Sequence, residues 1–198
     1  MADKKLSGKT KFSIDVRFAS NVPTSRVPLR AIQRGSASGS TAVAITDEVW
    51  SNATIEIKWE QLKDPIAKKT TLSIKELKVS ILFQCSVRYA REIDPSSACF
   101  AHVRQHEQRH VESRKQSLNR HRMLIIDYIK ENTSPKMADY VEVKDSQAPK
   151  VRNDAFKRID KALKDACGKV MTLSDDASKR IDTSTENART QALCAIYI

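Results

Sequence analysis

The stretch AHVRQHEQRH, residues 101–110, contains the pattern His-Glu-x-x-His. On an α-helix, residues four apart lie one turn apart on the same face. His106 and His110 can therefore present both imidazoles to one tetrahedral zinc ion, and Glu107 can take a proton from a zinc-bound water. The pattern predicts a zinc site carried on a helix. The alternative is a solvated basic helix whose histidines cluster without a metal.

Helical spacing continues around this stretch and predicts one long helix from residue 97 to residue 132. Ser97 suits the N-cap position, and Asn-Thr-Ser-Pro at residues 132–135 is expected to end the helix. The second half has an ordinary apolar face, formed by Val111, Leu118, Ile125 and Ile129. In the first half histidines stand where core residues are expected, and this departure indicates a functional site.

A catalytic zinc site needs a third protein ligand and one open position. His121 is on nearly the same face as His110, but three turns of continuous helix separate the two by about 16 Å. His102, one turn before His106, cannot easily join the same tetrahedron. An ordinary core or surface role is therefore expected for His102 and His121. The third ligand must come from elsewhere in the chain.

The N-terminal half has the pattern of a sheet. Alternation of apolar and polar residues predicts strands at residues 12–18, 41–46, 53–59, 70–74 and 77–89. The expected fold class is α+β, with a small antiparallel sheet in residues 10–92 and helices in residues 97–198, forming one domain over residues 1–198. Residues 1–10 are expected to be frayed, residues 21–28 to form a loop, and residues 35–40 to form a flexible turn.

After the motif helix the sequence predicts shorter elements. Residues 140–143 suit a brief strand, and residues 151–170 have the spacing of a second amphipathic helix that Gly168 can end. Residues 173–194 are expected to be helical in part.

Four cysteines allow three disulfide pairings. The preferred pairing is sequential, Cys85–Cys99 and Cys167–Cys194, and it implies an oxidising compartment. The alternative is four buried, reduced thiols. Secretion or export to the periplasm would require a leader, and residues 1–5 are not followed by an apolar signal segment, so the leader is expected to be absent from this sequence. No apolar run of about 20 residues predicts a membrane span.

The chain is basic, with a net charge of +11 and a pI near 9.6. This charge would suit an anionic partner such as nucleic acid, an acidic membrane surface or a cell-wall polymer. However, the lysines and arginines are spread along the whole length, and no basic strand with interleaved aromatic residues accompanies them. Nucleic acid is therefore disfavoured as a partner.

One further pattern lies near the C-terminus. Residues 181–191 read Ile-Asp-Thr-Ser-Thr-Glu-Asn-Ala-Arg-Thr-Gln. Together with Cys85 and His-Glu-x-x-His, this arrangement resembles a poorly characterised bacterial family of secreted zinc-dependent proteases. The C-terminal signature of that family is Tyr-Asp-x-x-Thr-x-His-Gly-x-x-Gln. Asp182, Thr185 and Gln191 fall in register with it, while the histidine and glycine of the family are Asn187 and Ala188 here.

The resemblance implies a zincin-like fold, bound Zn²⁺ and hydrolysis of peptides or proteins. It also raises the question of the missing histidine. The expected substitute is Glu186 as third ligand, with Asp182 as an orienting carboxylate. The alternatives are two histidines completed by water, a site that has lost catalysis, or a Glu186 and an Asp182 that are solvated helix charges. Candidates for polarising a substrate are Tyr128, Tyr140, His102 and Arg189.

These observations lead to three hypotheses. The first is a zinc metallopeptidase in which Glu107 is the general base and His106, His110 and Glu186 hold the metal. The second is a catalytically degenerate zincin-fold binding module whose basic surface contacts an acidic protein or a cell-wall polymer. The third is a nucleic-acid binder. The sequence carries no signal for an oligomeric state.

Overall fold

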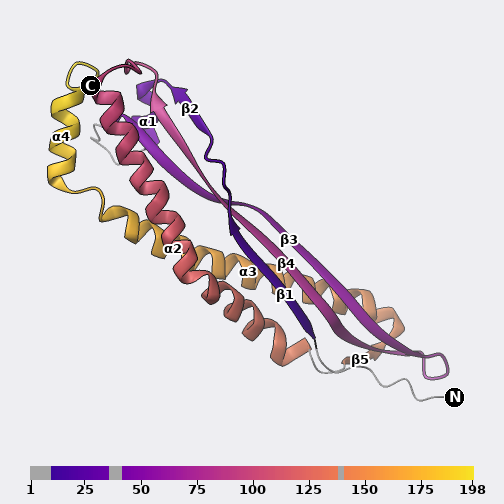
Figure 1. Cartoon of the computed structure of the whole chain (residues 1–198). Coiled ribbons are helices and arrows are strands. Elements are labelled where there is room, and N and C mark those ends of the chain that lie inside the picture. The colour runs from indigo at the N-terminus through magenta and orange to yellow at the C-terminus, as the bar shows by residue number, and fades with distance from the viewer. Residues whose placement is uncertain (1–9, 36–41, 138–140) are drawn as a thin grey trace. The chain divides into compact units, whose positions relative to one another are not determined.

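The computed structural model describes residues 10–35, 42–137 and 141–198. The predictions for residues 1–9 and 36–40, and for Tyr140, lie outside these ranges. The elements in chain order are β1 (Lys11–Phe18), β2 (Thr24–Val27), α1 (Leu29–Gly35), β3 (Ala44–Asp64), β4 (Lys69–Ala90), α2 (Ala98–Met137), β5 (Val141–Lys144), a single 3-10 turn (Asp145–Gln147), α3 (Ala148–Lys179) and α4 (Ser184–Cys194) (Figure 1). The predicted combination of a sheet-rich first half with a helical second half is confirmed.

The described ranges form two compact units, and neither is a continuous piece of chain. Unit 1 comprises residues 1–17, 52–82 and 121–170, and unit 2 comprises residues 18–51, 83–120 and 171–198. The long elements β3, β4, α2 and α3 therefore contribute residues to both units. The prediction of a single domain over residues 1–198 stays a prediction.

The described strands form one sheet in which β4 is the central strand. Its neighbours along the main path are β1 and β2, and β3 and β5 also pair with it. Each predicted pair of short strands is one long strand instead. In β4 the alternation of buried and exposed residues changes phase between Ile74 and Leu77, but the strand itself continues. The chain reverses between β3 and β4 at the turn of residues 65–68, where Pro65 cannot donate to a strand ladder.

The prediction of an antiparallel sheet was wrong. β5 does pair antiparallel with β4, joining Lys69–Leu72 to Val141–Lys144, but β2 pairs parallel with β4, with Thr24 opposite Val87 and Val27 opposite Ala90. The sequence analysis assigned β2 to a loop because Pro23 and Pro28 flank it. Both prolines lie just outside the four paired residues, where neither has to donate a ladder hydrogen bond.

Unit 1 buries apolar residues from strands and helices alike. Leu72 and Ile74 of β4, Ile125 and Ile129 of α2, and Ile159, Leu163 and Val170 of α3 are almost fully buried. The predicted helix at residues 151–170 is confirmed as part of the longer α3, which continues through Gly168 to Lys179. In the same way α2 extends past Pro135 to Met137. The predicted strand at residues 140–143 is confirmed as β5.

Unit 2 has a core formed where β3, β4, α1 and the first turns of α2 meet. It consists of Ile32, Val43, Ala44, Val87, Tyr89, Ala90, Ile93, Cys99, Val103 and Cys194. Tyr197, just after α4, is partly buried against this cluster. The core therefore packs both the start of the motif helix and the C-terminal end of the described chain.

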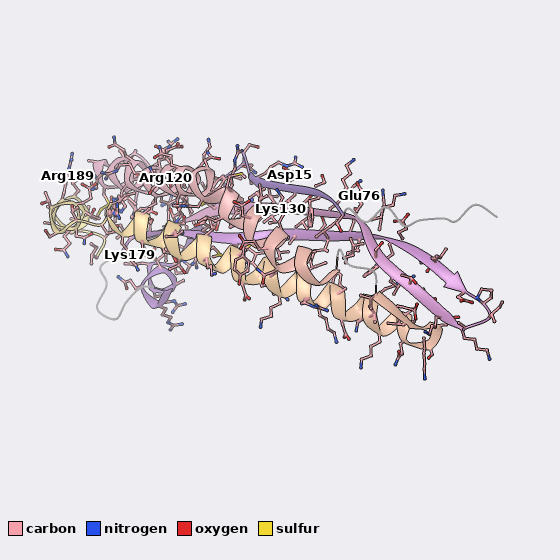
Figure 2. The ribbon with its side chains drawn as sticks, turned by 90° about the horizontal axis from the view of Figure 1, so that it is seen from below. Asp15, Glu76, Arg120, Lys130, Lys179 and Arg189 are labelled. Carbon is pink, nitrogen blue, oxygen red and sulfur yellow. A yellow bond between two sulfur atoms is a disulfide. The ribbon has the colours of Figure 1, made fainter. Side chains whose placement is uncertain are left out.

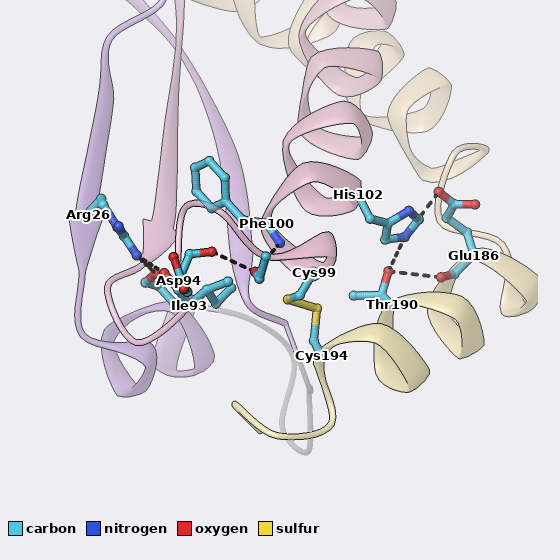
Figure 3. Close-up of a disulfide and its surroundings, with 11 residues drawn as sticks. Arg26, Ile93, Asp94, Cys99, Phe100, His102, Glu186, Thr190 and Cys194 are labelled. Atoms are coloured by element: carbon cyan, nitrogen blue, oxygen red, sulfur yellow. Dashed lines mark hydrogen bonds and ion pairs between the residues drawn. A yellow bond between two sulfur atoms is a disulfide. The ribbon is translucent and has the colours of Figure 1, made fainter.

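The disulfide in this core joins Cys99 to Cys194 (Figure 3). The sequential pairing was wrong, and Cys85 and Cys167 are buried free thiols. Sequence spacing cannot fix a pairing, because partners are set by which cysteines the fold brings within about 7 Å between Cα atoms. Cys99 and Cys194 are 95 residues apart in sequence, but their Cα atoms are only 5.1 Å apart.

None of the helices in the described ranges combines the length and the apolar character needed to cross a membrane.

Candidate metal centre

Three side chains of unit 2 bring potential metal ligands to one point. His106 Nε2 and His110 Nε2 are 2.9 Å apart, and they lie 3.1 and 3.0 Å from Asp182 Oδ1. Two ring nitrogens and one carboxylate oxygen thus form a small triangle. His106, His110 and Asp182 could hold a metal ion.

The helical spacing of the motif places the two histidines. Both belong to α2, one turn apart, so their rings lie side by side with centroids 4.6 Å apart. Asp182 comes from a different part of the chain, the short link between the end of α3 at Lys179 and the start of α4 at Ser184. Its position beside the two rings explains why no third ligand is visible near the motif in sequence.

A capping interaction sets the start of α4 directly after Asp182. The Thr183 hydroxyl accepts a hydrogen bond from the backbone N–H of Glu186 at 3.2 Å. Thr183-Ser184-Thr185-Glu186 has the Thr-x-x-Glu spacing of a capping box. This spacing is a sequence signal that α3 and α4 are separate helices and that Asp182 lies outside both.

Each histidine is held by a contact on the other side of its ring. His110 Nδ1 lies 2.6 Å from Ser178 Oγ of α3, and a proton on Nδ1 would leave the Nε2 lone pair facing the triangle. His106 Nδ1 lies 3.5 Å from Glu186 Oε1. Glu186 also forms an ion pair with Arg109, whose guanidinium lies 3.3 Å from the same ring nitrogen.

The two carboxylates therefore differ in position. Asp182 contacts the Nε2 atoms of both rings, whereas Glu186 lies beside the Nδ1 atom of one ring and pairs with a cation. The sequence analysis gave Glu186 the role of third ligand and Asp182 the role of orienting carboxylate. The group that could hold a metal ion contains Asp182 and not Glu186.

Electrostatics keep Asp182 ionised. Burial opposes ionisation, but hydrogen bonds from His106 and His110 outweigh burial and hold the pKa of the Asp182 carboxyl well below its usual range. The hydrogen bond to Asp182 raises the pKa of the His106 imidazole, against the opposing effect of burial. A cation entering the triangle would thus meet a charged carboxylate.

Glu107 follows His106 on α2 and belongs to the same unit. It is only 5% exposed, and its Oε2 accepts a hydrogen bond of 2.5 Å from the Thr46 hydroxyl at the start of β3. Burial raises the pKa of the Glu107 carboxyl, and the Thr46 hydroxyl partly offsets this rise. The Glu107 carboxylate is therefore more basic than that of an exposed glutamate, as suits a general base that works near neutral pH.

A cleft of about 590 Å³ gives access to these groups. Its lining includes His106, Glu107, His110 and Asp182, so the general-base candidate and the ligand triangle open onto one space. Val43, just before β3, and Ile45 of β3 line it as well. The cleft thus combines charged and polar groups with apolar side chains from the start of the strand.

An ion-pair network that was not predicted from the sequence borders the cleft. Arg114, one turn after His110, lies 2.7 Å from Glu48 of β3 and 2.9 Å from Asp175 of α3. Burial opposes the charge of Arg114, but the hydrogen bond to Glu48 and the neighbouring carboxylates together raise its pKa. The network ties α2 to β3 and α3 close to Thr46 and Ser178. The sequence indicates this network only by the position of Arg114, four residues after His110.

The other sequence candidates lie away from the triangle. His102 contacts Thr190 Oγ1 at 3.1 Å and lies 3.8 Å from Glu186, and burial lowers its pKa (Figure 3). Arg189 is exposed on α4 and is not part of the cleft lining. His121 and Tyr128 belong to unit 1, not to the unit that carries the candidate metal centre.

Comparisons with protein-family models, with curated proteins and with solved structures find no match for this chain.

Proposed function

We propose that this chain is a zinc-dependent hydrolase, and specifically a metallopeptidase, whose metal is held by His106, His110 and Asp182. The observation that carries the proposal is the triangle of two imidazole nitrogens and one carboxylate oxygen, with a buried glutamate opening onto the same cleft. The zincin-like fold implied by the motif remains part of the proposal.

The donor set fits zinc. Zinc–nitrogen and zinc–oxygen bonds of about 2.0–2.1 Å in a tetrahedron place neighbouring ligand atoms roughly 3.3 Å apart. The observed separations of 2.9, 3.0 and 3.1 Å are close to this value. Three protein ligands and one open position are typical of catalytic rather than structural zinc sites. The contacts of Ser178 and Glu186 to the outer ring nitrogens are the kind that orient ligand histidines.

When bound, zinc would supply a Lewis acid that lowers the pKa of a water and polarises a carbonyl. The chain itself supplies the proton acceptor. The Glu107 carboxylate, held by the Thr46 hydroxyl, would take the proton from the water and later deliver it to the leaving amine. Burial raises the pKa of the Glu107 carboxyl, which makes its carboxylate a stronger base than that of an exposed glutamate.

The proposed substrate is a peptide or protein. We also propose that the chain works in an oxidising compartment, outside the cell or in the periplasm, because the Cys99–Cys194 disulfide is compatible with such a location.

The decisive test is Glu107→Gln, compared with Gln108→Ala at the exposed neighbouring position. Glu107→Gln should keep one zinc per chain but lower peptide hydrolysis by about 10²–10⁴-fold, because the general base is lost. Gln108→Ala should retain both zinc and activity. Hydrolysis unaffected by Glu107→Gln would refute the mechanism, and a wild-type chain that takes up no stoichiometric zinc after reconstitution would refute the site.

The second candidate is a non-catalytic binding module that keeps the metal site. The basic residues Arg120 and Lys130 of α2, Lys179 of α3 and Arg189 of α4 are all exposed (Figure 2). They are distributed over three helices, which suits weak contacts to an extended acidic protein or cell-wall polymer more than one compact pocket. Binding to an acidic polymer without any hydrolysis of a peptide library would favour this candidate. Binding to nucleic acid that falls steeply with salt would favour the nucleic-acid hypothesis.

A further inference from the structure

α4 has little hydrophobic attachment of its own. Of its eleven residues, Ser184–Cys194, only Cys194 is buried. A helix without a buried apolar face gains little from packing, and helices of this length are marginal in water without tertiary support. Something other than a hydrophobic face must therefore hold α4 in place.

The attachments of α4 lead to α2. Thr190 and Glu186 contact His102, and Glu186 pairs with Arg109. The covalent attachment is the disulfide from Cys194 to Cys99 in the first turn of α2 (Figure 3). Polar contacts at a partly exposed surface contribute little to stability, so the disulfide and the partly buried Tyr197 are the main anchors of α4.

The same two helices carry the candidate ligands. Cys99 precedes His106 by seven residues (106 − 99) on one continuous helix, and Asp182 lies directly before the cap of α4. The bridge thus closes a loop that brings residue 182, far along the chain, back to the histidines. The disulfide and the three candidate ligands therefore lie on the same two segments of unit 2, the first half of α2 and the region from residue 182 to the end of α4.

We propose that the Cys99–Cys194 disulfide is a positioning element of the metal centre, and that the oxidised chain binds zinc more tightly than a chain without the bridge. This inference rests on the proposed zinc site. Without the bridge, α4 and the link before it sample positions in which Asp182 is away from His106 and His110. Zinc binding must then order that segment, and the ordering free energy is subtracted from the affinity.

The test compares the full-length wild type with the double variant Cys99→Ala/Cys194→Ala. Alanine is chosen because free thiols would themselves bind zinc. Zinc affinity is measured by competition with a chromophoric chelator, and exchange of the amides of residues 184–194 is measured in parallel. We expect the double variant to bind zinc at least about tenfold more weakly and its α4 amides to exchange faster than those of wild type. Cys167→Ala, a buried free cysteine in unit 1, is the matched control and should bind zinc as wild type does.

A second measurement uses the unaltered chain and does not depend on a variant that folds. Binding couplings are reciprocal, so zinc must stabilise the disulfide by the same factor by which the disulfide strengthens zinc binding. The midpoint for reduction of Cys99–Cys194 is measured in glutathione redox buffers with zinc at a constant free concentration and again without zinc. With zinc, the midpoint should shift towards more reducing conditions. Zinc captured by the released thiols would shift the midpoint in the opposite direction.

The outcomes separate the two proposals. Equal zinc affinity of wild type and the double variant, or an unchanged redox midpoint, would overturn the positioning role and leave the zinc site intact. Failure of the oxidised wild type to bind zinc would overturn the zinc site itself.

Discussion

Asp182 and Glu186 are four residues apart, yet their surroundings give them different tasks. Within the described part of the chain, the ion pairs of Asp182 are those with the two imidazoles, and its oxygen faces both Nε2 atoms. Glu186 has its charge balanced by Arg109 and reaches only the outer edge of His106. A bound cation would draw its third bond from the carboxylate that is not already paired with an arginine.

The first prediction follows from this difference. Asp182→Asn should weaken zinc binding by more than about 100-fold, because an anionic ligand is lost, whereas Glu186→Gln should weaken it by roughly tenfold, as loss of an orienting contact does. Asp176→Asn, which alters an exposed carboxylate paired with Lys179, is the control and should have no effect. Chelator competition measures all three. A larger loss for Glu186→Gln than for Asp182→Asn would reverse the assignment.

The two free thiols give the second prediction. Burial raises the pKa of both Cys85 and Cys167 to about 12, so neither forms the reactive thiolate near neutral pH. At pH 8, iodoacetamide should modify no cysteine of the native chain. It should modify these two cysteines in denaturant and all four after reduction, as counted by mass spectrometry. Rapid alkylation of Cys85 in the native chain would contradict its buried position.

At the scale of single elements, α2 combines two functions along one helix. Its N-terminal part carries the histidines, and its later turns carry core residues of unit 1 such as Ile125 and Ile129. The predicted apolar face of the second half is confirmed, since Leu118, Ile125 and Ile129 are buried. Stability and metal binding should therefore respond to substitutions in different parts of the helix.

The third prediction uses two adjacent residues of α2. Ile125 is 0% exposed and Leu124 is 52% exposed. Ile125→Ala should lower the free energy of unfolding by about 2–5 kcal/mol, because it leaves a cavity. Leu124→Ala should change it by no more than about 0.5 kcal/mol. Urea denaturation measures both, and a similar loss for the two variants would show that Ile125 does not face the core.

The fourth prediction concerns the start of α4. Thr183→Ala removes the hydroxyl that accepts from the Glu186 N–H and should cost about 1 kcal/mol of helix stability. Because Asp182 is the preceding residue, zinc affinity should fall by roughly fivefold. Thr183→Ser keeps an accepting hydroxyl and should restore the affinity, while Thr185→Ala, at an exposed position, should leave it unchanged. Unaltered zinc affinity in Thr183→Ala would show that the N-cap of α4 does not position Asp182.

What the sequence could predict differs from one element to the next. The spacing of His106 and His110 is local, and one helical turn is enough to bring them together. Asp182 is 72 residues from His110, so only the fold places it there. The four-residue strand β2 was not predicted, because so short a run between two prolines carries no alternation that a loop lacks. Its pairing with β4 made the sheet mixed rather than antiparallel.

For the molecule as a whole, the disulfide shows the same limit. The even number of cysteines correctly suggested a bridge, but the pairing depends on a contact between residues 95 positions apart. Loop-closure entropy gives such a long-range bridge a large stabilising effect, about 4–5 kcal/mol in the chain-entropy model. The sequence therefore indicated that a disulfide forms, but not which cysteines it joins.

The fifth prediction concerns global stability. A ligand that binds only the folded state raises the free energy of unfolding by about 2.7 kcal/mol at a concentration of 100 times its Kd. Zinc at that level should shift the denaturation midpoint of wild type upwards, and the shift should disappear in Asp182→Asn. Magnesium at the same concentration should have little effect, since it disfavours imidazole ligands. A shift that survives in Asp182→Asn would place the zinc elsewhere.

The alternation of the two units along the chain has a consequence for biosynthesis. Because unit 2 includes residues 18–51, 83–120 and 171–198, its first residues leave the ribosome long before its last. His106 and His110 emerge first, and Asp182 follows His110 only after another 72 residues. A nascent chain that stops short holds two histidines without the carboxylate or the bridge. Assembly of the candidate metal centre is therefore postponed until the segment with Asp182 and Cys194 has left the ribosome.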